Sequence, residues 1–205
     1  MGPLNSSSAR LWKLIDERIK DGSNTDAIDQ RIWDLFGEEW TVMFTDLAGF
    51  SRQVAKFGII HFLQIIHEQK HLLLPIVERH DGVLIKIEAD SFLILFKKPA
   101  RALACAVAME RACRALNARR APEEQVVLCV GIGYGRILKI GDEDVFGHEV
   151  NLSSKLGEDT AKANEILVTR AAHEAIGEHA GVAWEELAVQ YAGETVCWRA
   201  SYRSS

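Results

Sequence analysis

The hydrophobic positions of the chain switch between two spacings, one typical of strands and one typical of helices. Residues 40–44 form a run of apolar and β-branched side chains with the length of a strand that is buried on both faces. Apolar side chains then recur at helical spacing over residues 51–80, and Gly58 and Pro75 should each bend or interrupt that helix. The Asp-Gly pair at residues 81–82 provides the turn that ends it.

The same alternation continues to the end of the chain. A hairpin of two buried strands is predicted within residues 83–96, with Glu88 and Ala89 at its tight turn. Beyond it, the spacing predicts a helix over residues 99–119, strands over 125–133, 136–140 and 165–169, a short helix over 171–178 and a terminal strand over 193–202. The order strand–helix–strand–strand–helix–strand predicts an α+β fold with the ferredoxin-like βαββαβ arrangement and further elements added to it.

Two helices are predicted before the first strand. Residues 10–20 and 25–36 each carry apolar side chains on one helical face. We therefore divide the chain into an N-terminal helical extension, residues 1–38, and a domain of residues 39–205. This helical hairpin could pack on the domain or serve dimerisation, and the amount of apolar surface on it, which includes Trp12, favours dimerisation.

The composition is that of an ordinary globular chain. Its 205 residues, 48% of them hydrophobic and 26% charged, are enough for one hydrophobic core and an extension. A net charge of −5 provides no basic field for nucleic acid or for an anionic membrane. The sequence shows no apolar stretch long enough for a membrane span and no signal-peptide core. The four cysteines show no paired spacing, so we expect reduced core residues in a cytoplasmic protein.

Candidate chemistry begins with Asp46, which closely follows the strand of residues 40–44. Leu47, Ala48 and Gly49 then lead into the long helix. A carboxylate at a strand end, followed by a small-residue turn into a helix, fits a metal-bound phosphate chain. The acid can hold a hard cation, while the free amides of the first helical turn bind phosphate oxygens. Asp46 could alternatively be a helix N-cap.

A second acid and a polar pair extend this hypothesis. Asp90 begins the second strand of the predicted hairpin, which can bring it beside Asp46. Two carboxylates that converge at strand ends suit Mg²⁺ or Mn²⁺ carrying a nucleotide. Asn151 and Lys155 lie four residues apart, so on a helix they would share one face.

Three segments together resemble a known family. F-T-D-L-A-G-F, K-I-E-A-D-S-F and D-V-F-G-H-E-V-N-L-S-S-K occur in the order and spacing of the class III nucleotide cyclase catalytic domain. The resemblance runs from about Trp40 to the C-terminus. It implies the cyclase homology fold and a reaction in which the ribose 3′-oxygen of a nucleoside triphosphate attacks the α-phosphorus and releases diphosphate. It also implies two divalent cations, Mn²⁺ or Mg²⁺, held by Asp46, Asp90 and the backbone carbonyl of Leu47.

The resemblance implies roles for further residues. Phe50 and Ser51 match positions that lie against the bound nucleotide, and Asn151 matches the residue that positions the ribose. Lys155 stands where most members have arginine, so the charge is kept but the planar two-pronged donor is lost. Ala89 replaces the glycine that usually precedes the second aspartate.

The resemblance also implies an assembly. Such cyclases work as homodimers with shared active sites, in which Asp46 and Asp90 would come from one subunit. The residues expected from the other subunit are Lys86, Asp144, Asn151 and Lys155. A C-terminal lysine that grips the triphosphate in many relatives has no counterpart around residues 190–193. This departure and Lys155 leave a second hypothesis, a catalytically idle cyclase-fold module that binds a nucleotide or a partner.

The base of the nucleotide is assigned by resemblance alone. Lys86 and Asp144 match the pair that marks adenine in adenylate cyclases, where lysine donates to a ring nitrogen and aspartate accepts from the exocyclic amine. In its length, its E-A-D-S-F turn and its S-K-L-G-E-D segment, the chain is similar to the Pycsar pyrimidine cyclases of bacterial antiphage defence. We therefore favour conversion of UTP to cyclic UMP, with adenylate cyclase as the alternative.

Two further segments match parts of known motifs. Residues 67–71, H-E-Q-K-H, match the zinc peptidase signature, but a zinc site needs a third ligand and Lys70 places a cation inside the motif. We interpret this segment as the solvated face of a helix. The glycines of residues 131–135 lack the third glycine of a dinucleotide loop and are interpreted as a strand followed by a turn.

Overall fold

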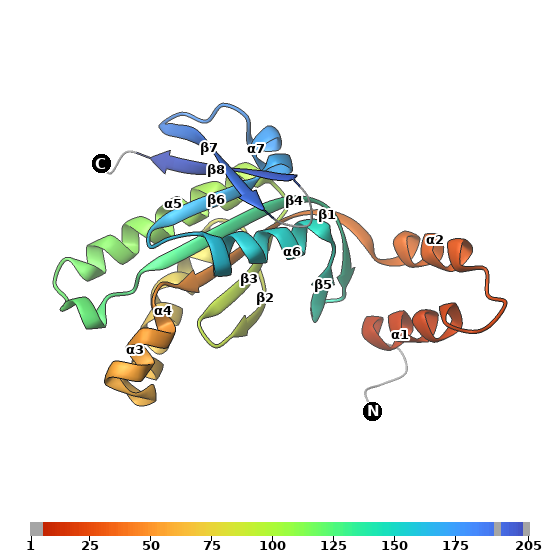
Figure 1. Cartoon of the computed structure of the whole chain (residues 1–205), viewed down its shortest axis with the longest axis horizontal. Helices are drawn as coiled ribbons and strands as arrows, with labels where there is room; N and C mark the ends of the chain where they lie inside the picture. Colours follow the sequence, from red (N-terminus) through yellow and green to blue (C-terminus); the bar gives the residue numbers. More distant parts are fainter. Residues whose placement is uncertain (1–5, 191–193, 203–205) are drawn as a thin grey trace.

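The computed structural model describes residues 6–190 and 194–202, whose strands form one mixed β-sheet (Figure 1). The strand order is β2–β3–β1–β4–β6–β8–β7, with β5 paired to β4 beside this path. The strands are β1 (Gly37–Leu47), β2 (Val83–Glu88), β3 (Ser91–Phe96), β4 (Leu128–Ile140), β5 (Asp144–Phe146), β6 (Glu165–Thr169), β7 (Val182–Gln190) and β8 (Glu194–Tyr202). The helices are α1 (Ser7–Arg18), α2 (Thr25–Phe36), α3 (Phe50–Phe57), α4 (Ile59–Arg79), α5 (Pro99–Asn117), α6 (His148–Ser154) and α7 (Arg170–Ile176).

The predicted fold class is confirmed. Strands β2, β3, β1 and β4 are antiparallel neighbours in that order, which is the ferredoxin-like arrangement of two strand–helix–strand units. Strand β6 joins β4 in parallel, and the antiparallel pair β7–β8 extends the sheet beyond it. The sheet is therefore mixed, with one parallel pair among the described strands.

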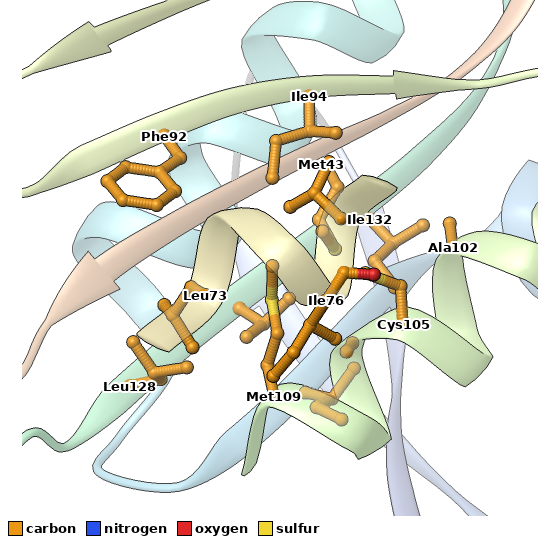
Figure 2. Close-up of a cluster of buried hydrophobic side chains, with 14 of the residues drawn as sticks. Met43, Leu73, Ile76, Phe92, Ile94, Ala102, Cys105, Met109, Leu128 and Ile132 are labelled. Carbon is orange, nitrogen blue, oxygen red and sulfur yellow. The ribbon is translucent and has the colours of Figure 1, made fainter. Parts of the chain in front are cut away.

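Alternation along the central strands divides the apolar side chains between two faces of the sheet. Met43, Phe92 and Ile94 lie on the face covered by α4 and α5, where they join the largest hydrophobic cluster (Figure 2). Val42 and Leu93 point to the other face and pack with Val150 of α6. Because both faces are covered, the central strands are apolar at successive positions, as the sequence pattern predicts.

The N-terminal hairpin stands at one end of the molecule and packs on the end of β4 (Figure 1). Ser6 caps α1, since its Oγ accepts a hydrogen bond from the backbone N–H of Ala9 at 3.2 Å. A small cluster of buried side chains joins the hairpin to the sheet; it consists of Leu11, Leu14, Ile32, Phe36 and Ile140. Packing on the domain is therefore present, while Trp12, 56% exposed, remains uncovered in the single chain.

The interruption expected at Gly58 is present, and the turn expected between residues 133 and 136 is absent. Gly58, with φ of 86°, separates α3 from α4, but Pro75 lies inside α4, which continues to Arg79. A proline removes one helical hydrogen bond, and the packing of the apolar face of this 21-residue helix outweighs that loss. The strands predicted over 125–133 and 136–140 are one strand, β4, with no turn between them.

The turn within β4 was predicted from the glycines of residues 131–135. A Cβ atom on Gly131 would lie 2.1 Å from the backbone oxygen of Ser153, and one on Gly133 would lie 2.7 Å from that of Glu149. These glycines let α6 approach the strand closely, so they mark a packing contact and not a turn. Strands β5 and β7 were not predicted at all, because β5 has three residues and β7 carries charged side chains among its apolar ones.

The four cysteines are all free and buried, which confirms the expectation of unpaired core residues. Burial raises the pKa of the Cys105 thiol to about 12, so this cysteine is not poised for reaction. Among the described helices, none combines the length and the apolarity needed to cross a lipid bilayer.

A buried acid in α5 makes the stability of the fold depend on pH. Glu110 is fully buried, both of its carboxyl oxygens lack a hydrogen-bond partner among the described residues, and burial raises its pKa to about 7. Between the ordinary pKa of 4.5 and about 7, the folded protein keeps this proton while the unfolded chain has released it. The contribution of Glu110 to stability therefore falls as the pH rises through this window.

We expect Glu110→Gln to raise the free energy of unfolding relative to the native chain, by about 3 kcal/mol at pH 8 and by almost nothing at pH 4.5. Urea melts of both proteins at several pH values measure this difference. Glu174→Gln, on the exposed side of α7, is the control and should show no comparable dependence on pH. A difference that stays constant between pH 4.5 and 8 would refute the assignment.

Candidate active site

The structure brings the two candidate aspartates together. Asp46 is the penultimate residue of β1, and antiparallel pairing of Thr45 with Phe92 places it opposite Ser91, next to Asp90. Ser91 Oγ donates a hydrogen bond to Asp46 Oδ1 at 2.9 Å. The backbone N–H of Leu47 donates to Asp90 Oδ2 at 3.3 Å. One strand end and one hairpin turn therefore present two carboxylates at a single point.

Both carboxyl groups have raised pKa values. Burial is the largest cause for Asp46, whose pKa rises to about 6, and the neighbouring charge of Asp90 adds to it. Burial is again the main cause of the raised pKa of Asp90, and the Glu158 carboxylate raises it further against the hydrogen bond from Leu47. Two acids that are partly desolvated and repel each other form a site that a cation would stabilise.

The chemistry of these donors fits a divalent metal ion. Carboxylate oxygens are the ligands that Mg²⁺ and Mn²⁺ prefer, and two of them with raised pKa values converge here. Among the described residues, no group of three or more His, Cys, Asp or Glu side chains is arranged to hold a metal ion. Further ligands would therefore be backbone oxygens, water or substrate. The direction of the Leu47 carbonyl stays a prediction, since the contact seen at Leu47 is made by its N–H.

The turn between β2 and β3 is strained. It lies at Ala89 and Asp90, one residue later than predicted, and Ala89 has φ of 51°. A residue other than glycine that adopts this left-handed backbone conformation destabilises the fold by about 1–2 kcal/mol.

We expect Ala89→Gly to stabilise the fold by about 0.5–1 kcal/mol, because relief of this strain exceeds the added entropy of the unfolded chain. Urea unfolding with an unchanged m-value would measure it. Ala104→Gly, inside α5, is the matched control and should destabilise by about 1 kcal/mol. Destabilisation by both substitutions would contradict the assignment of strain to the turn.

Gln69 is a residue of this site that sequence reasoning missed. It is fully buried in α4, and its Nε2 donates to the backbone oxygen of Asp90 at 2.9 Å. Ile65 and Leu73, one helical turn to either side, are core residues, so a polar side chain at a core position was the available signal.

The side chains of the H-E-Q-K-H motif lie on the outer part of α4, apart from Gln69. His67 and His71 lie on the exposed face of α4, with ring centroids 4.3 Å apart. Glu68 forms an ion pair with Arg120 and accepts a hydrogen bond from Gln64 at 3.1 Å. The solvated-face interpretation agrees with these contacts.

A small pocket lies beside the aspartates. Its volume is about 180 Å³, and its lining includes Phe44, Lys86, Ser91, Asp144 and Glu158. Lys86 Nζ contacts Asp144 Oδ2 at 3.1 Å and Glu88 Oε1 at 3.2 Å. Burial lowers the pKa of Lys86, but its hydrogen bonds to the two acids outweigh this and the pKa is raised. The lysine is therefore charged, and a donor and an acceptor lie side by side in the pocket.

Asn151 and Lys155 are placed elsewhere. Asn151 is exposed on α6, and Lys155 begins a π-helical turn, Lys155–Thr160, in which its Nζ pairs with Asp159 at 2.7 Å. Neither side chain lines the pocket, whereas Ser154 and Glu158 do. The pocket is therefore lined by sequence neighbours of Asn151 and Lys155 and not by these two residues.

Two predicted nucleotide-binding residues cannot be placed in the same detail. Phe50 and Ser51 form the start of α3, directly after Gly49, whose φ is 82°. Their side chains lie outside the part of the chain that the structure describes, as does the segment 191–193 searched for a C-terminal lysine. The turn into a helix after Asp46, on which the phosphate hypothesis depends, is present.

The fold and the acidic site together define a class, the cyclase homology domains. The family model of the adenylate and guanylate cyclase catalytic domain matches residues 37–196, and the chain belongs to this family. Members of this class III family are phosphorus–oxygen lyases. A putative adenylate cyclase 3 of Rhizobium meliloti is 30% identical over 134 residues, which are 65% of this chain and 22% of the relative. The chain spans between 15% and 22% of the length of the curated relatives it matches.

Solved structures agree with the fold. The crystal structure of the guanylyl cyclase Cya2 matches with a TM-score of 0.70 and 22% identity over 82% of this chain and 94% of that chain. The adenylyl cyclase CyaB from P. aeruginosa matches with a TM-score of 0.68 and 18% identity over 82% of this chain and 96% of that chain. At these identities the likeness establishes the fold alone.

Proposed function

We propose that this chain is a metal-dependent nucleotide cyclase that converts a nucleoside triphosphate to a 3′,5′-cyclic nucleotide and diphosphate. The observation that carries the proposal is the convergence of Asp46 and Asp90 at the end of β1, where two carboxylates with raised pKa values suit a divalent cation. The new bond joins the ribose 3′-oxygen to the α-phosphorus, the bond from that phosphorus to diphosphate breaks, and the 3′-hydroxyl proton is released.

Asp46 and Asp90 would hold two divalent cations, Mn²⁺ or Mg²⁺. When bound, such ions lower the pKa of the 3′-hydroxyl and neutralise phosphate charge. The backbone N–H groups at the start of α3 would donate hydrogen bonds to phosphate oxygens at the positive end of the helix dipole. Asn151 would orient the ribose, and Lys155 would stabilise the charge that develops on the phosphate.

We favour uracil, a pyrimidine, as the base of the nucleoside triphosphate substrate. Lys86 could donate to O4 of uracil while Asp144 accepts from its N3–H, so the pair suits uracil as well as adenine. The preference for uracil comes from the similarity of the E-A-D-S-F and S-K-L-G-E-D segments to the Pycsar pyrimidine cyclases. This supports conversion of UTP to cyclic UMP, in the antiphage role that similarity to the Pycsar cyclases suggests. ATP is the alternative, because the Lys86–Asp144 spacing matches adenylate cyclases.

A homodimer with shared active sites completes the proposal. Asp46 and Asp90 of each site would come from one subunit. Lys86, Asp144, Asn151 and Lys155 would come from the other, as the resemblance to the class III cyclases implies. Apolar side chains at the start of α4 also lack cover in the single chain: Ile59 is 51% exposed, Ile60 76% and Leu63 50%. A second copy would cover such a surface.

The second candidate is a catalytically idle module. The pairing of Lys155 with Asp159 at 2.7 Å favours it, because the cation is engaged within its own turn. A module of this kind would bind a nucleotide or a partner without turnover.

The deciding experiment incubates the protein with Mn²⁺ and each of the four ribonucleoside triphosphates separately, and identifies the products by mass. Cyclic UMP is the expected product. Cyclic AMP alone would refute the pyrimidine assignment. The absence of any cyclic product, with nucleotide binding retained, would refute the cyclase proposal in favour of the idle module.

A further inference from the structure

We propose that Gln69 is a positioning residue that fixes the metal-binding geometry of Asp90 through a hydrogen bond from α4 to the β2–β3 turn. This inference rests on the proposed role of Asp46 and Asp90 as metal ligands. It concerns a residue that touches neither substrate nor reacting atoms and acts through the backbone of Asp90.

The contact is specific and buried. Gln69 Nε2 donates to the backbone oxygen of Asp90 at 2.9 Å, and no part of Gln69 is accessible to solvent. The side-chain oxygen of Gln69 is buried as well, without a hydrogen-bond partner among the described residues. A buried amide group left half-satisfied costs about 1–3 kcal/mol, which offsets the hydrogen bond, so packing of the core alone does not account for a glutamine at this position. A glutamine at this position therefore indicates a role outside core packing. Its one hydrogen-bonded atom, Nε2, contacts the β2–β3 turn that carries Asp90.

The hydrogen bond from Gln69 restrains a turn whose conformation sets the position of the Asp90 carboxylate. Ala89 holds a left-handed conformation, with φ of 51°, that it adopts only under constraint. On the far side of this turn the Asp90 carboxylate accepts from the Leu47 N–H, and Ser91 donates to Asp46. Gln69 holds the backbone of Asp90 from α4 while Leu47 holds its side chain from β1. With the carbonyl released, the turn could relax and the two carboxylates would no longer keep one spacing.

This arrangement predicts a weaker metal site in a protein that remains folded. Groups that orient the ligands of a metal typically contribute 10- to 100-fold in metal affinity. We therefore expect Gln69→Met to raise the dissociation constant for Mn²⁺ by about 10-fold or more. Cyclisation should fall at limiting Mn²⁺ and recover when Mn²⁺ is raised by about the same factor. The thermal midpoint should change little, since one unsatisfied oxygen is lost along with one hydrogen bond.

The test measures Mn²⁺ binding to the full chain by the electron paramagnetic resonance signal of the free ion, without nucleotide, alongside activity and thermal unfolding. Gln64→Met is the matched control, because Gln64 is an exposed glutamine on the same helix that bonds Glu68. Gln69→His keeps a donor nitrogen the same number of bonds from Cα and should recover part of the affinity. Asp90→Asn removes a proposed metal ligand, so it tests whether Mn²⁺ binds at the pair of aspartates.

The outcomes separate the two proposals. If the native chain binds Mn²⁺ no better than Asp90→Asn does, the metal assignment fails and this inference fails with it. If Asp90→Asn loses Mn²⁺ while Gln69→Met binds it like the native chain, only the positioning role is refuted. Equal losses in Gln69→Met and Gln69→His would assign the effect to packing and also overturn the inference.

Discussion

Replacing Asp90 by asparagine should lower the rate of cyclisation by about 100- to 1,000-fold at saturating substrate. Asparagine has the same shape and can still accept the hydrogen bond from the Leu47 N–H through its side-chain oxygen. What it removes is the negative charge that would hold a divalent cation beside Asp46. Product formation with Mn²⁺ and the preferred triphosphate, measured by mass, gives the change in rate.

The same substitution should stabilise the protein. The pKa of Asp46 is raised to about 6 by burial and by the charge of Asp90, so in the folded state the ionised pair is unfavourable above that pH. Removal of one charge should increase the free energy of unfolding at pH 8 by about 1 kcal/mol, after allowance for solvent screening at Asp46, which is partly exposed. An active site commonly carries such a cost in stability.

The opposite signs of the two effects make the experiment informative. General damage to the fold would lower activity and stability together. Asp21→Asn, in the exposed loop between α1 and α2, is the control and should leave activity unchanged. Retention of near-native activity by Asp90→Asn in Mn²⁺ would refute the assignment of this acid as a metal ligand.

The elements that were predicted correctly are those with a strong local pattern. Strand β6 matches its predicted bounds, Glu165–Thr169, and α2 matches its predicted bounds, Thr25–Phe36, because each repeats one apolar spacing between clear ends. The meeting of Asp46 and Asp90 was also predictable, since a hairpin turn and a strand end must lie at one edge of an antiparallel sheet.

What the sequence could not reveal depends on contacts between distant segments. The role of Gly131 is visible only once α6 lies across β4, because a glycine in a strand and a glycine in a turn look alike in sequence. Gln69 bonds a carbonyl 21 residues away, and no local rule pairs a helix side chain with a particular backbone oxygen. Motif spacing likewise could not show that Asn151 does not line the pocket that contains Lys86 and Asp144 of the same chain.

A mixture of two inactive variants should regain activity if the active sites are shared. Asp90→Asn disables the acidic half of each site, and Asn151→Ala disables the half that we assign to the partner subunit. In a mixed dimer one site carries both defects and the other carries none. Random exchange of subunits makes about half of the dimers mixed, so the mixture should reach about a quarter of the native rate.

The control for this experiment uses the same chemistry with a different distribution of defects. A mixture of Asp46→Asn with Asp90→Asn places one defect in every site of every dimer, so it should stay inactive. The rates are measured after the two variants of each pair are coexpressed or subunits are exchanged at equal concentration, with the product identified by mass. If each chain carried a complete site, Asn151 and Asp90 would act together in one subunit and neither mixture would recover. Recovery in the first mixture alone would therefore place Asn151 and Asp90 of each working site on different subunits.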